Sequence, residues 1–282
     1  MTVSLAVAVA SQPLCFITPQ RRPSDIMDQE EIEKRLWYNL KEWNLRKTMK
    51  WNKKFKYPSC TRSLIQGKRH YDVNHEKLPS VTTILAATQT KEKRESLQKW
   101  QDRIGKENAI RIRDQAAERG TIMHSILEAH LAGKNRVDLT DLGKEARIMA
   151  QQIIEQGLTD LDEIWGSEVT LYYPELYAGA TDVVGVYDGQ ESICDFKQSN
   201  KPKRREWIGD YFLQLGGYAM AHNHIYGTKI TQGVVLICTK DNLFQRFVTN
   251  GSEFVTYQHG FLERVSQYYD NLGKSVSKIR QK

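Results

Sequence analysis

Cysteine is scarce in this chain of 282 residues, and no two of its four cysteines are spaced as a CxxC pair. The four are Cys15, Cys60, Cys194 and Cys238. This spacing argues against a zinc ribbon, an iron–sulfur cluster and a disulfide-stapled scaffold. Because free thiols are typical of a reducing compartment, we expect an intracellular protein.

Long apolar runs and nucleotide-binding loops are also missing. No segment approaches the roughly 20 apolar residues that a membrane-spanning helix needs, so we expect no membrane partner. No G-x-x-x-x-G-K-[ST] loop is present, so we expect no helicase motor in this chain. The apolar stretch near the N-terminus is short and follows no Lys or Arg, which is a poor signal peptide. We expect residues 1–26 to be disordered or an extension upstream of Met27.

Acidic residues are absent between Trp43 and Tyr71, in a chain with a formal net charge of +7. Basic and aromatic residues alternate there, which suits phosphate contacts and base stacking on a single DNA strand. A flexible solubilising linker is the alternative. We predict a basic N-terminal helix and arm over residues 27–77. Its candidate DNA-binding residues are Lys50, Trp51, Lys53 and Lys54.

The rest of the chain reads as helices followed by alternating strands and helices. Helices are expected over about 78–88, 91–118, 121–133, 141–157, 203–226 and 252–278, with Gly120 ending the second. Strands are expected over 167–173, 178–187, 191–197, 229–240 and 243–250. This order predicts an α/β fold with a helical N-terminal region over about 27–44.

Two strands joined at Asp188 and Gly189 carry three charged residues. An Asp-Gly pair between apolar strands indicates a two-residue hairpin. In that register Asp182 lies directly opposite Asp195, and Lys197 points to the same face. Facing carboxylates repel each other unless a cation lies between them, and oxygen ligands suit Mg²⁺ or Mn²⁺. A surface cluster of ion pairs is the alternative.

Four motifs resemble the PD-(D/E)xK nuclease superfamily and its RecB-like exonuclease branch, and their order along the chain agrees with that family. "GATDVVGVYDG…ICDFKQS" is similar to the D-x(n)-D-x-K core, and "RGTIMHSILEAHL" to a G-x-x-x-H helix motif. "QLGGYAMA" is similar to the Q-x-x-x-Y motif. "LPSVTTIL" with the helix after it resembles mitochondrial genome maintenance exonucleases and their phage-encoded relatives. The resemblance covers about residues 69–270.

The resemblance implies a fold and a set of residue roles. The fold is a restriction-endonuclease-like core over residues 78–282, with a central mixed sheet flanked by helices. The implied metal ligands are His124, Asp182, Asp195 and the backbone carbonyl of Phe196. The implied catalytic residues are Asp182, Asp195, Lys197, Gln214 and Tyr218. Glu168 is a secondary candidate that would tune the site. Further candidate DNA contacts are Ser80, Thr82, Arg204 and Arg205.

Together these features predict Mg²⁺- or Mn²⁺-dependent hydrolysis of DNA, by an exonuclease acting on single-stranded ends in replication, recombination or repair. Proteins of replication or recombination are the expected partners. No cysteine follows Cys238, so no iron–sulfur cluster is expected. A structure-specific endonuclease and a catalytically inactive nucleic-acid-binding module are the alternatives. A cytoplasmic location, including the cytoplasm of a phage-infected cell, is preferred over a mitochondrial one.

Overall fold

The computed structural model describes residues 50–273. Our expectations for residues 1–26 and for a helix within 27–44 therefore lie outside the described part. All of the described residues belong to one compact unit of the chain.

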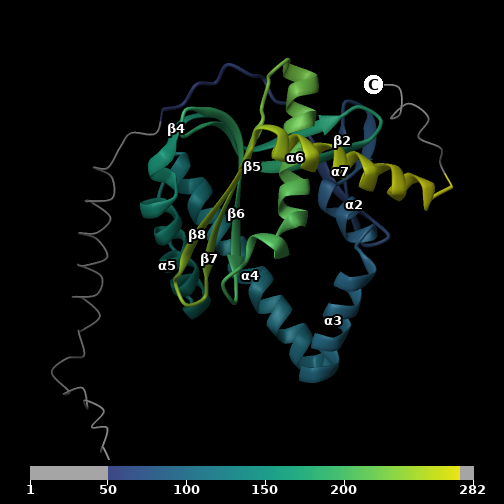
Figure 1. Cartoon of the computed structure of the whole chain (residues 1–282). Helices are drawn as coiled ribbons and strands as arrows, with labels where there is room; N and C mark the ends of the chain where they lie inside the picture. The colour runs from purple at the N-terminus through teal and green to yellow at the C-terminus, as the bar shows by residue number, and fades with distance from the viewer. Residues whose placement is uncertain (1–49, 274–282) are drawn as a thin grey trace, which may run out of the picture. The chain divides into compact units, whose positions relative to one another are not determined.

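A five-stranded mixed sheet forms the centre of this unit (Figure 1). Its strands, in spatial order, are β4 (Leu161–Tyr173), β5 (Tyr177–Tyr187), β6 (Gln190–Ser199), β7 (Gln232–Thr239) and β8 (Phe244–Asn250). Strands β6 and β7 are parallel, and the other neighbours are antiparallel. The expected strands are all present, and the predicted α/β fold with a mixed sheet is confirmed.

Helices cover both faces of the sheet. They are α2 (Val81–Ala87), α3 (Lys91–Ile104), α4 (Lys106–Leu131), α5 (Asp141–Gln156), α6 (Gly209–Tyr226) and α7 (Gly251–Asp270). In Figure 1, α5 lies to the left of the strands and α6 to the right. Alternation along β6 explains the two layers, because Ile193 packs with Phe212 of α6 while the Phe196 ring lies against His124 of α4.

Three predicted helix boundaries are wrong, the first being the end of α7 at Asp270 and not near residue 278. Helix α4 continues through Gly120, and the chain breaks instead at Gly105, whose φ of 85° is outside the helical range. Gly120 serves close packing, since a Cβ there would lie 3.3 Å from the Gln198 side chain. Helix α6 begins at Gly209 and not near Lys203, because Lys and Arg residues are unfavourable at the positive end of a helix.

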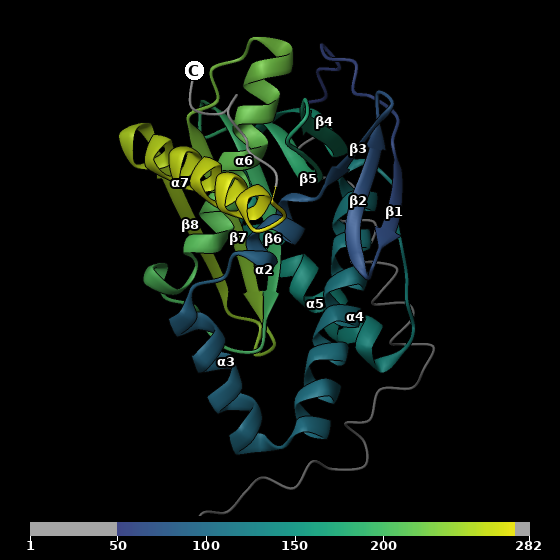
Figure 2. The ribbon, with the colours of Figure 1, turned by 90° about the vertical axis from the view of Figure 1, so that its right-hand side faces the viewer.

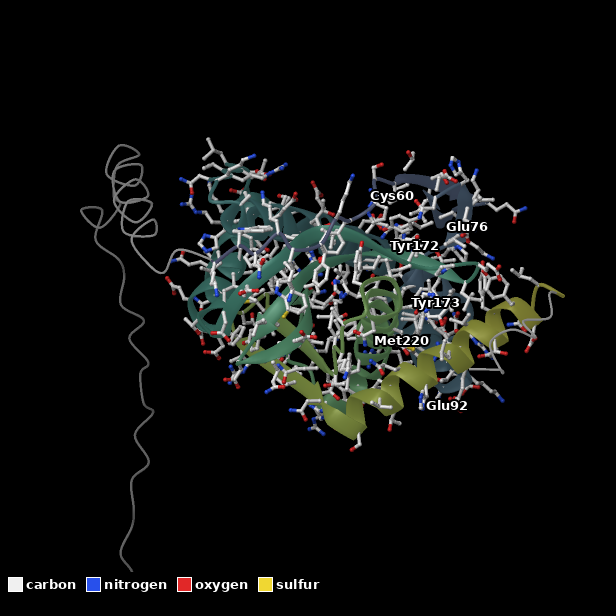
Figure 3. The ribbon with its side chains drawn as sticks, turned by 90° about the horizontal axis from the view of Figure 1, so that it is seen from above. Cys60, Glu76, Glu92, Tyr172, Tyr173 and Met220 are labelled. Carbon is white, nitrogen blue, oxygen red and sulfur yellow. The ribbon has the colours of Figure 1, made fainter. Side chains whose placement is uncertain are left out.

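Residues 61–79, which we expected to lie largely in an arm, form a small antiparallel sheet. Its strands are β1 (Thr61–Ile65), β2 (Lys68–Val73) and β3 (Glu76–Pro79). Positive φ angles at the two tight turns, 50° at Gln66 and 48° at Asn74, match two-residue hairpins. The buried side chains of β2 and β3 pack on Ala178, with Cys60 and Tyr172 beside them (Figure 3). The domain boundary expected at residues 77/78 falls within β3.

Two aromatic residues of the basic segment, Phe55 and Tyr57, pack against the hydrophobic core. Phe55 and Tyr57 contact the imidazole of His222, with ring centroids 4.9 and 5.9 Å away. Trp165 and Tyr226 complete the aromatic cluster. These two aromatic residues are therefore engaged in packing, not displayed for base stacking.

The buried His222 makes the stability of this cluster depend on pH. Burial, with the nearby Lys54 cation, lowers the pKa of His222 from 6.5 to about 4. Between these values the unfolded chain binds a proton that the folded chain does not, so stability falls as pH drops from 6.5 towards 4. We expect this histidine to cost about 2 kcal/mol of unfolding free energy on going from pH 7.5 to pH 5.

Urea unfolding at the two pH values tests this expectation. The comparison protein is His222→Gln, which keeps a polar group near Tyr57 and Thr228 but cannot titrate. The variant should lose about 2 kcal/mol less than the wild-type protein over the same interval. Equal losses in both proteins would contradict a neutral, buried His222.

Candidate active site

Strands β5 and β6 stop pairing next to the charged residues Asp182 and Asp195. Their ladder follows the predicted register up to the pair Val183–Cys194, and β6 then continues alongside β7 alone. Beyond the last pair, the Asp182 carboxylate accepts a hydrogen bond of 2.6 Å from the backbone N–H of Phe196. The Asp182 side chain thus takes the place of a backbone partner for Phe196. We call the point where β5 and β6 stop pairing the fork.

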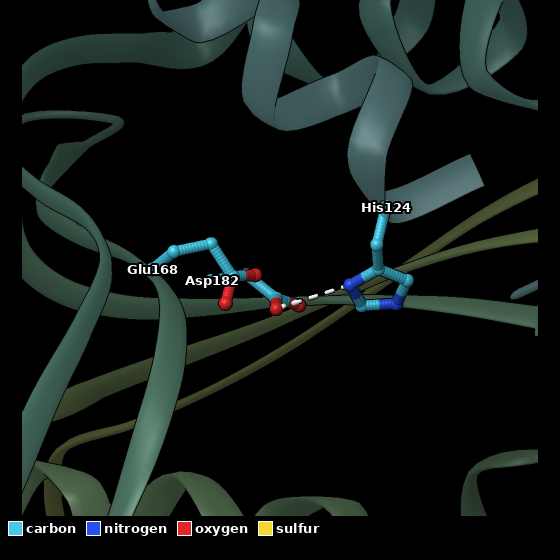
Figure 4. A group of neighbouring side chains, drawn as sticks. All are labelled: His124, Glu168 and Asp182. Atoms are coloured by element: carbon cyan, nitrogen blue, oxygen red, sulfur yellow. Dashed lines mark hydrogen bonds and ion pairs between the residues drawn. The ribbon is translucent and has the colours of Figure 1, made fainter. Parts of the chain in front are cut away.

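Three side chains that could hold a metal ion gather at this fork. Ligand atoms of His124, Glu168 and Asp182 lie within 4.8 Å of one another (Figure 4). His124 comes from α4, and its Nδ1 lies 3.1 Å from Oδ1 of Asp182. Glu168 lies on β4 opposite Asp182, between residues that pair with Val183 and Thr181. Its φ of 51° is a strained conformation of the kind that often marks a functional site.

The unbroken path of α4 brings His124 to the fork. One turn earlier, the buried guanidinium of Arg119 donates hydrogen bonds of 2.9 and 3.2 Å to the side-chain oxygen of Gln198. Arg119 also contacts Asn200 and Glu145, so it ties α4 to the end of β6. A charged residue that is 3% exposed is stable only with such partners. Arg119 was not among the predicted site residues, although it is the first residue of the "RGTIMHSILEAHL" motif.

The three donors fit a divalent cation. One imidazole nitrogen and two carboxylates form a mainly oxygen ligand set, which suits Mg²⁺ or Mn²⁺. Burial works against a charge on His124, but the Asp182 carboxylate outweighs it and raises the pKa of His124 to about 9. Desolvation and the same carboxylate raise the pKa of Glu168 to about 8. The repulsion between carboxylates as close together as Glu168 and Asp182 is relieved when a cation lies between them.

The two aspartates, Asp182 and Asp195, differ in how readily they ionise. Burial opposes ionisation of Asp182, yet His124, Lys197 and the Phe196 N–H together lower its pKa to about 2. Asp182 therefore stays ionised. The pKa of Asp195 is raised, chiefly by burial, although Lys197 acts in the other direction.

The Asp195 carboxylate belongs to a second network, on the α6 side of the sheet. It forms an ion pair with Lys197 and accepts a hydrogen bond of 3.1 Å from Nε2 of Gln214. The same nitrogen lies 3.1 Å from the hydroxyl of Tyr218, to which it also donates. The ion pair outweighs burial and raises the pKa of Lys197, which stays cationic. The structure thus brings Asp195, Lys197, Gln214 and Tyr218 together. Their catalytic roles, and the roles of Asp195 and of the Phe196 carbonyl as metal ligands, stay predictions.

A cleft of about 540 Å³ opens onto both networks. Ser80 and Thr82, which we predicted as DNA contacts, line it. Ser80 is 2% exposed and caps α2 by accepting the Thr83 N–H at 2.9 Å, so its hydroxyl is committed to the fold. Thr82 is exposed to the cleft. The cleft also has three charged residues that sequence analysis did not single out, namely Arg62, Arg69 and Glu128.

The other predicted DNA-binding residues do not line this cleft. Lys50 pairs with Glu163 at 3.0 Å, and the Lys54 ammonium lies 3.6 Å from the Trp165 ring centroid. The Trp51 indole donates a hydrogen bond to the Leu131 carbonyl, with Lys53 over its ring. Arg204 stacks over Trp207, and Arg205 pairs with Glu253. Their contact with DNA stays a prediction.

Comparison with known proteins finds relatives among exonucleases. The protein named Mitochondrial genome maintenance exonuclease 1 from Mus musculus is 27% identical over 194 residues, 62% of this chain and 56% of that protein. Proteins of the same name from Homo sapiens and Xenopus tropicalis are 29% and 28% identical, each over 58% of this chain. The chain spans about half the length of these relatives. No protein-family model matches the chain.

A crystal structure of a protein from Eubacterium rectale overlaps part of the fold. It matches with a TM-score of 0.42 at 16% identity, over 56% of this chain and 66% of that one. An overlap of this extent carries no argument about function. Separately, none of the described helices is long and apolar enough to cross a membrane.

Proposed function

We propose that this chain is a metal-dependent DNA exonuclease of the PD-(D/E)xK superfamily, acting on single-stranded ends. The observation that carries the proposal is the fork between β5 and β6. There the cluster of His124, Glu168 and Asp182 lies beside the ion pair of Asp195 and Lys197. The exonuclease names of the relatives support the same reaction class.

Each network has a distinct task in this proposal. His124, Glu168 and Asp182 would hold the divalent cation, with Asp195 as a further ligand. A divalent cation bound there would polarise the phosphate and lower the pKa of a water molecule. Lys197 remains protonated and would stabilise negative charge that develops on the phosphate oxygens. The side-chain amide of Gln214 donates hydrogen bonds to the Asp195 carboxylate and to the Tyr218 hydroxyl, and so would orient the carboxylate.

The relatives also bear on the cellular role. Their name refers to maintenance of the mitochondrial genome, so the mitochondrial location gains support beside the cytoplasmic one. Replication, recombination and repair all need removal of single-stranded ends, and we propose a role in one of them.

End-labelled DNA provides the decisive assay. With Mg²⁺, the protein should degrade linear single-stranded DNA and leave circular single-stranded DNA intact, because an exonuclease needs an end. EDTA should stop the reaction. Cutting of the circle would establish the endonuclease instead. Binding of both substrates without cutting of either would favour the inactive binding module.

A further inference from the structure

The β1–β2 hairpin carries two arginines on the face that lines the candidate active-site cleft. In its register Arg62 is opposite Tyr71, and Leu64 is opposite Arg69. Because side chains alternate along a strand, these four side chains share one face of the hairpin. Three of them, Arg62, Arg69 and Tyr71, line the cleft that also contains the metal-binding candidates. Figure 2 shows the two strands of the hairpin, labelled β1 and β2.

The two guanidinium groups have no partner within the described part of the chain. Neither Arg62 nor Arg69 forms a side-chain hydrogen bond or an ion pair with another described residue. Other basic residues that we considered as DNA contacts are engaged, as Lys50 is with Glu163 and Arg205 with Glu253. Two carboxylates of the same cleft are committed elsewhere, Asp182 to His124 and Asp195 to Lys197, while Glu128 and Glu168 also line it without an ion pair to either arginine. Two unneutralised arginines at a cleft suit an anion with two or more charged groups.

One wall of the cleft includes short side chains. Ala116, Ala117, Gly120 and Thr121 of α4 line it, one and two turns before His124. Short side chains let a bulky polymer backbone approach the helix closely. Together, the arginine face and this low wall suit an extended chain of phosphates and sugars that leads to the fork.

Leu64 adds an apolar contact on the same hairpin face. It is 73% exposed, on a strand whose neighbouring side chains on this face are Arg62 and Arg69. An exposed leucine between cations gains no stability from burial in the free protein. It would instead make an apolar contact with an unpaired base whose flanking phosphates contact the arginines.

We propose that Arg62 and Arg69 bind the phosphates of a single DNA strand next to the scissile bond, and that Leu64 contacts a base of that strand. The inference rests on the proposed nuclease function, which it deepens by naming the wall of the cleft that holds the substrate. Both arginines act as positioning residues, since the reacting phosphate would lie at the fork, against the metal-binding cluster and Lys197.

Binding in the presence of EDTA tests the inference separately from cleavage. Fluorescence anisotropy with a labelled oligo(dT) should show binding about fivefold to tenfold weaker for Arg62→Gln and for Arg69→Gln. Each variant should lower the slope of log affinity against log salt by about 1. With Mg²⁺ present, KM should rise while kcat stays close to its wild-type value. Arg62→Lys and Arg69→Lys should recover part of the affinity, because the charge remains.

Lys68→Gln is the matched control. Lys68 lies on the same hairpin and loses the same charge, but it points away from the arginine face and does not line the cleft. Its affinity should stay within about twofold of the wild-type value. Circular dichroism would confirm that every variant is folded.

Three results would overturn the inference in different ways. If the wild-type protein binds and cleaves the strand, and the Arg62→Gln/Arg69→Gln double variant binds as tightly as Lys68→Gln, the assignment of these arginines is wrong and the nuclease function stands. If the wild-type protein neither binds nor cleaves single-stranded DNA, both proposals are wrong. Equal losses of affinity for duplex and single-stranded DNA would overturn the single-strand assignment.

Discussion

Lys197→Ala should lower the rate of DNA cleavage by about a thousandfold, which is a typical loss when one preorganised charge at a reaction centre is removed. The Lys197 ammonium is the cation that pairs with Asp195, beside the metal-binding candidates. Its raised pKa keeps it charged at neutral pH, so it would stabilise negative charge on the reacting phosphate. Single-turnover degradation of end-labelled single-stranded DNA in Mg²⁺ measures the effect. DNA binding in EDTA should change little, because phosphate contacts elsewhere remain.

The variant also leaves a buried carboxylate without its partner. Asp195 is 3% exposed, and breaking a buried ion pair typically costs about 3–5 kcal/mol. Lys197→Met with Asp195→Asn removes both charges and separates loss of function from loss of folding. Lys229→Ala is the control of equal charge, since Lys229 is exposed and does not line the cleft. A folded Lys197→Ala protein that cleaves DNA at the wild-type rate would show that this lysine has no role in catalysis.

Asp182→Asn should abolish both metal binding and cleavage. Asp182 contacts His124 and Phe196 directly and lies within ligand distance of Glu168, so it is the centre of the cluster. Loss of a hydrogen-bonding partner around a metal typically weakens binding about 10–100-fold, and loss of a ligand should cost at least that much. Calorimetric titration with Mn²⁺ measures the change in affinity without any substrate.

Glu128→Gln provides the matched control for Asp182→Asn. Glu128 lies one turn after His124 on α4 and lines the same cleft, but it does not belong to the cluster of three. Glu128→Gln removes the same charge as Asp182→Asn but no member of the cluster. The Mn²⁺ affinity of this variant should therefore remain close to that of the wild-type protein. If the two variants bind Mn²⁺ equally well, the cation is not held by Asp182, and the cluster at the fork is not the metal site.

Much of the sheet could be predicted because strand patterns are local. Asp188 and Gly189 specify a tight hairpin, and apolar residues on each side mark its strands. The register then follows from the loop length, and the structure confirms it up to Val183 and Cys194. The alternation of side chains also predicted correctly that Asp195 and Lys197 share a face.

Helix boundaries and the basic segment were harder to predict because tertiary contacts decide them. Gly120 looks like a helix stop, yet the helix continues and the residue accommodates Gln198. Phe55 and Tyr57 look suited to stacking on bases, but they find a buried histidine instead. In both cases the sequence shows what a residue can do, and the neighbours that decide its role lie far away along the chain.

The sequence by itself determined the β5–β6 register up to Val183 and Cys194 and the shared face of Asp195 and Lys197, because hairpin register and strand alternation depend only on residues close together in the chain. Only the tertiary structure decided which partners those charges acquire. The fork between the two strands, the unbroken path of α4 and the turned backbone at Glu168 bring His124 and Glu168 to Asp182, and leave Asp195 with Lys197 and Gln214. Likewise, only folding placed Arg62 and Arg69 at the cleft, because that position depends on packing of the small sheet against β5, about a hundred residues further along the chain.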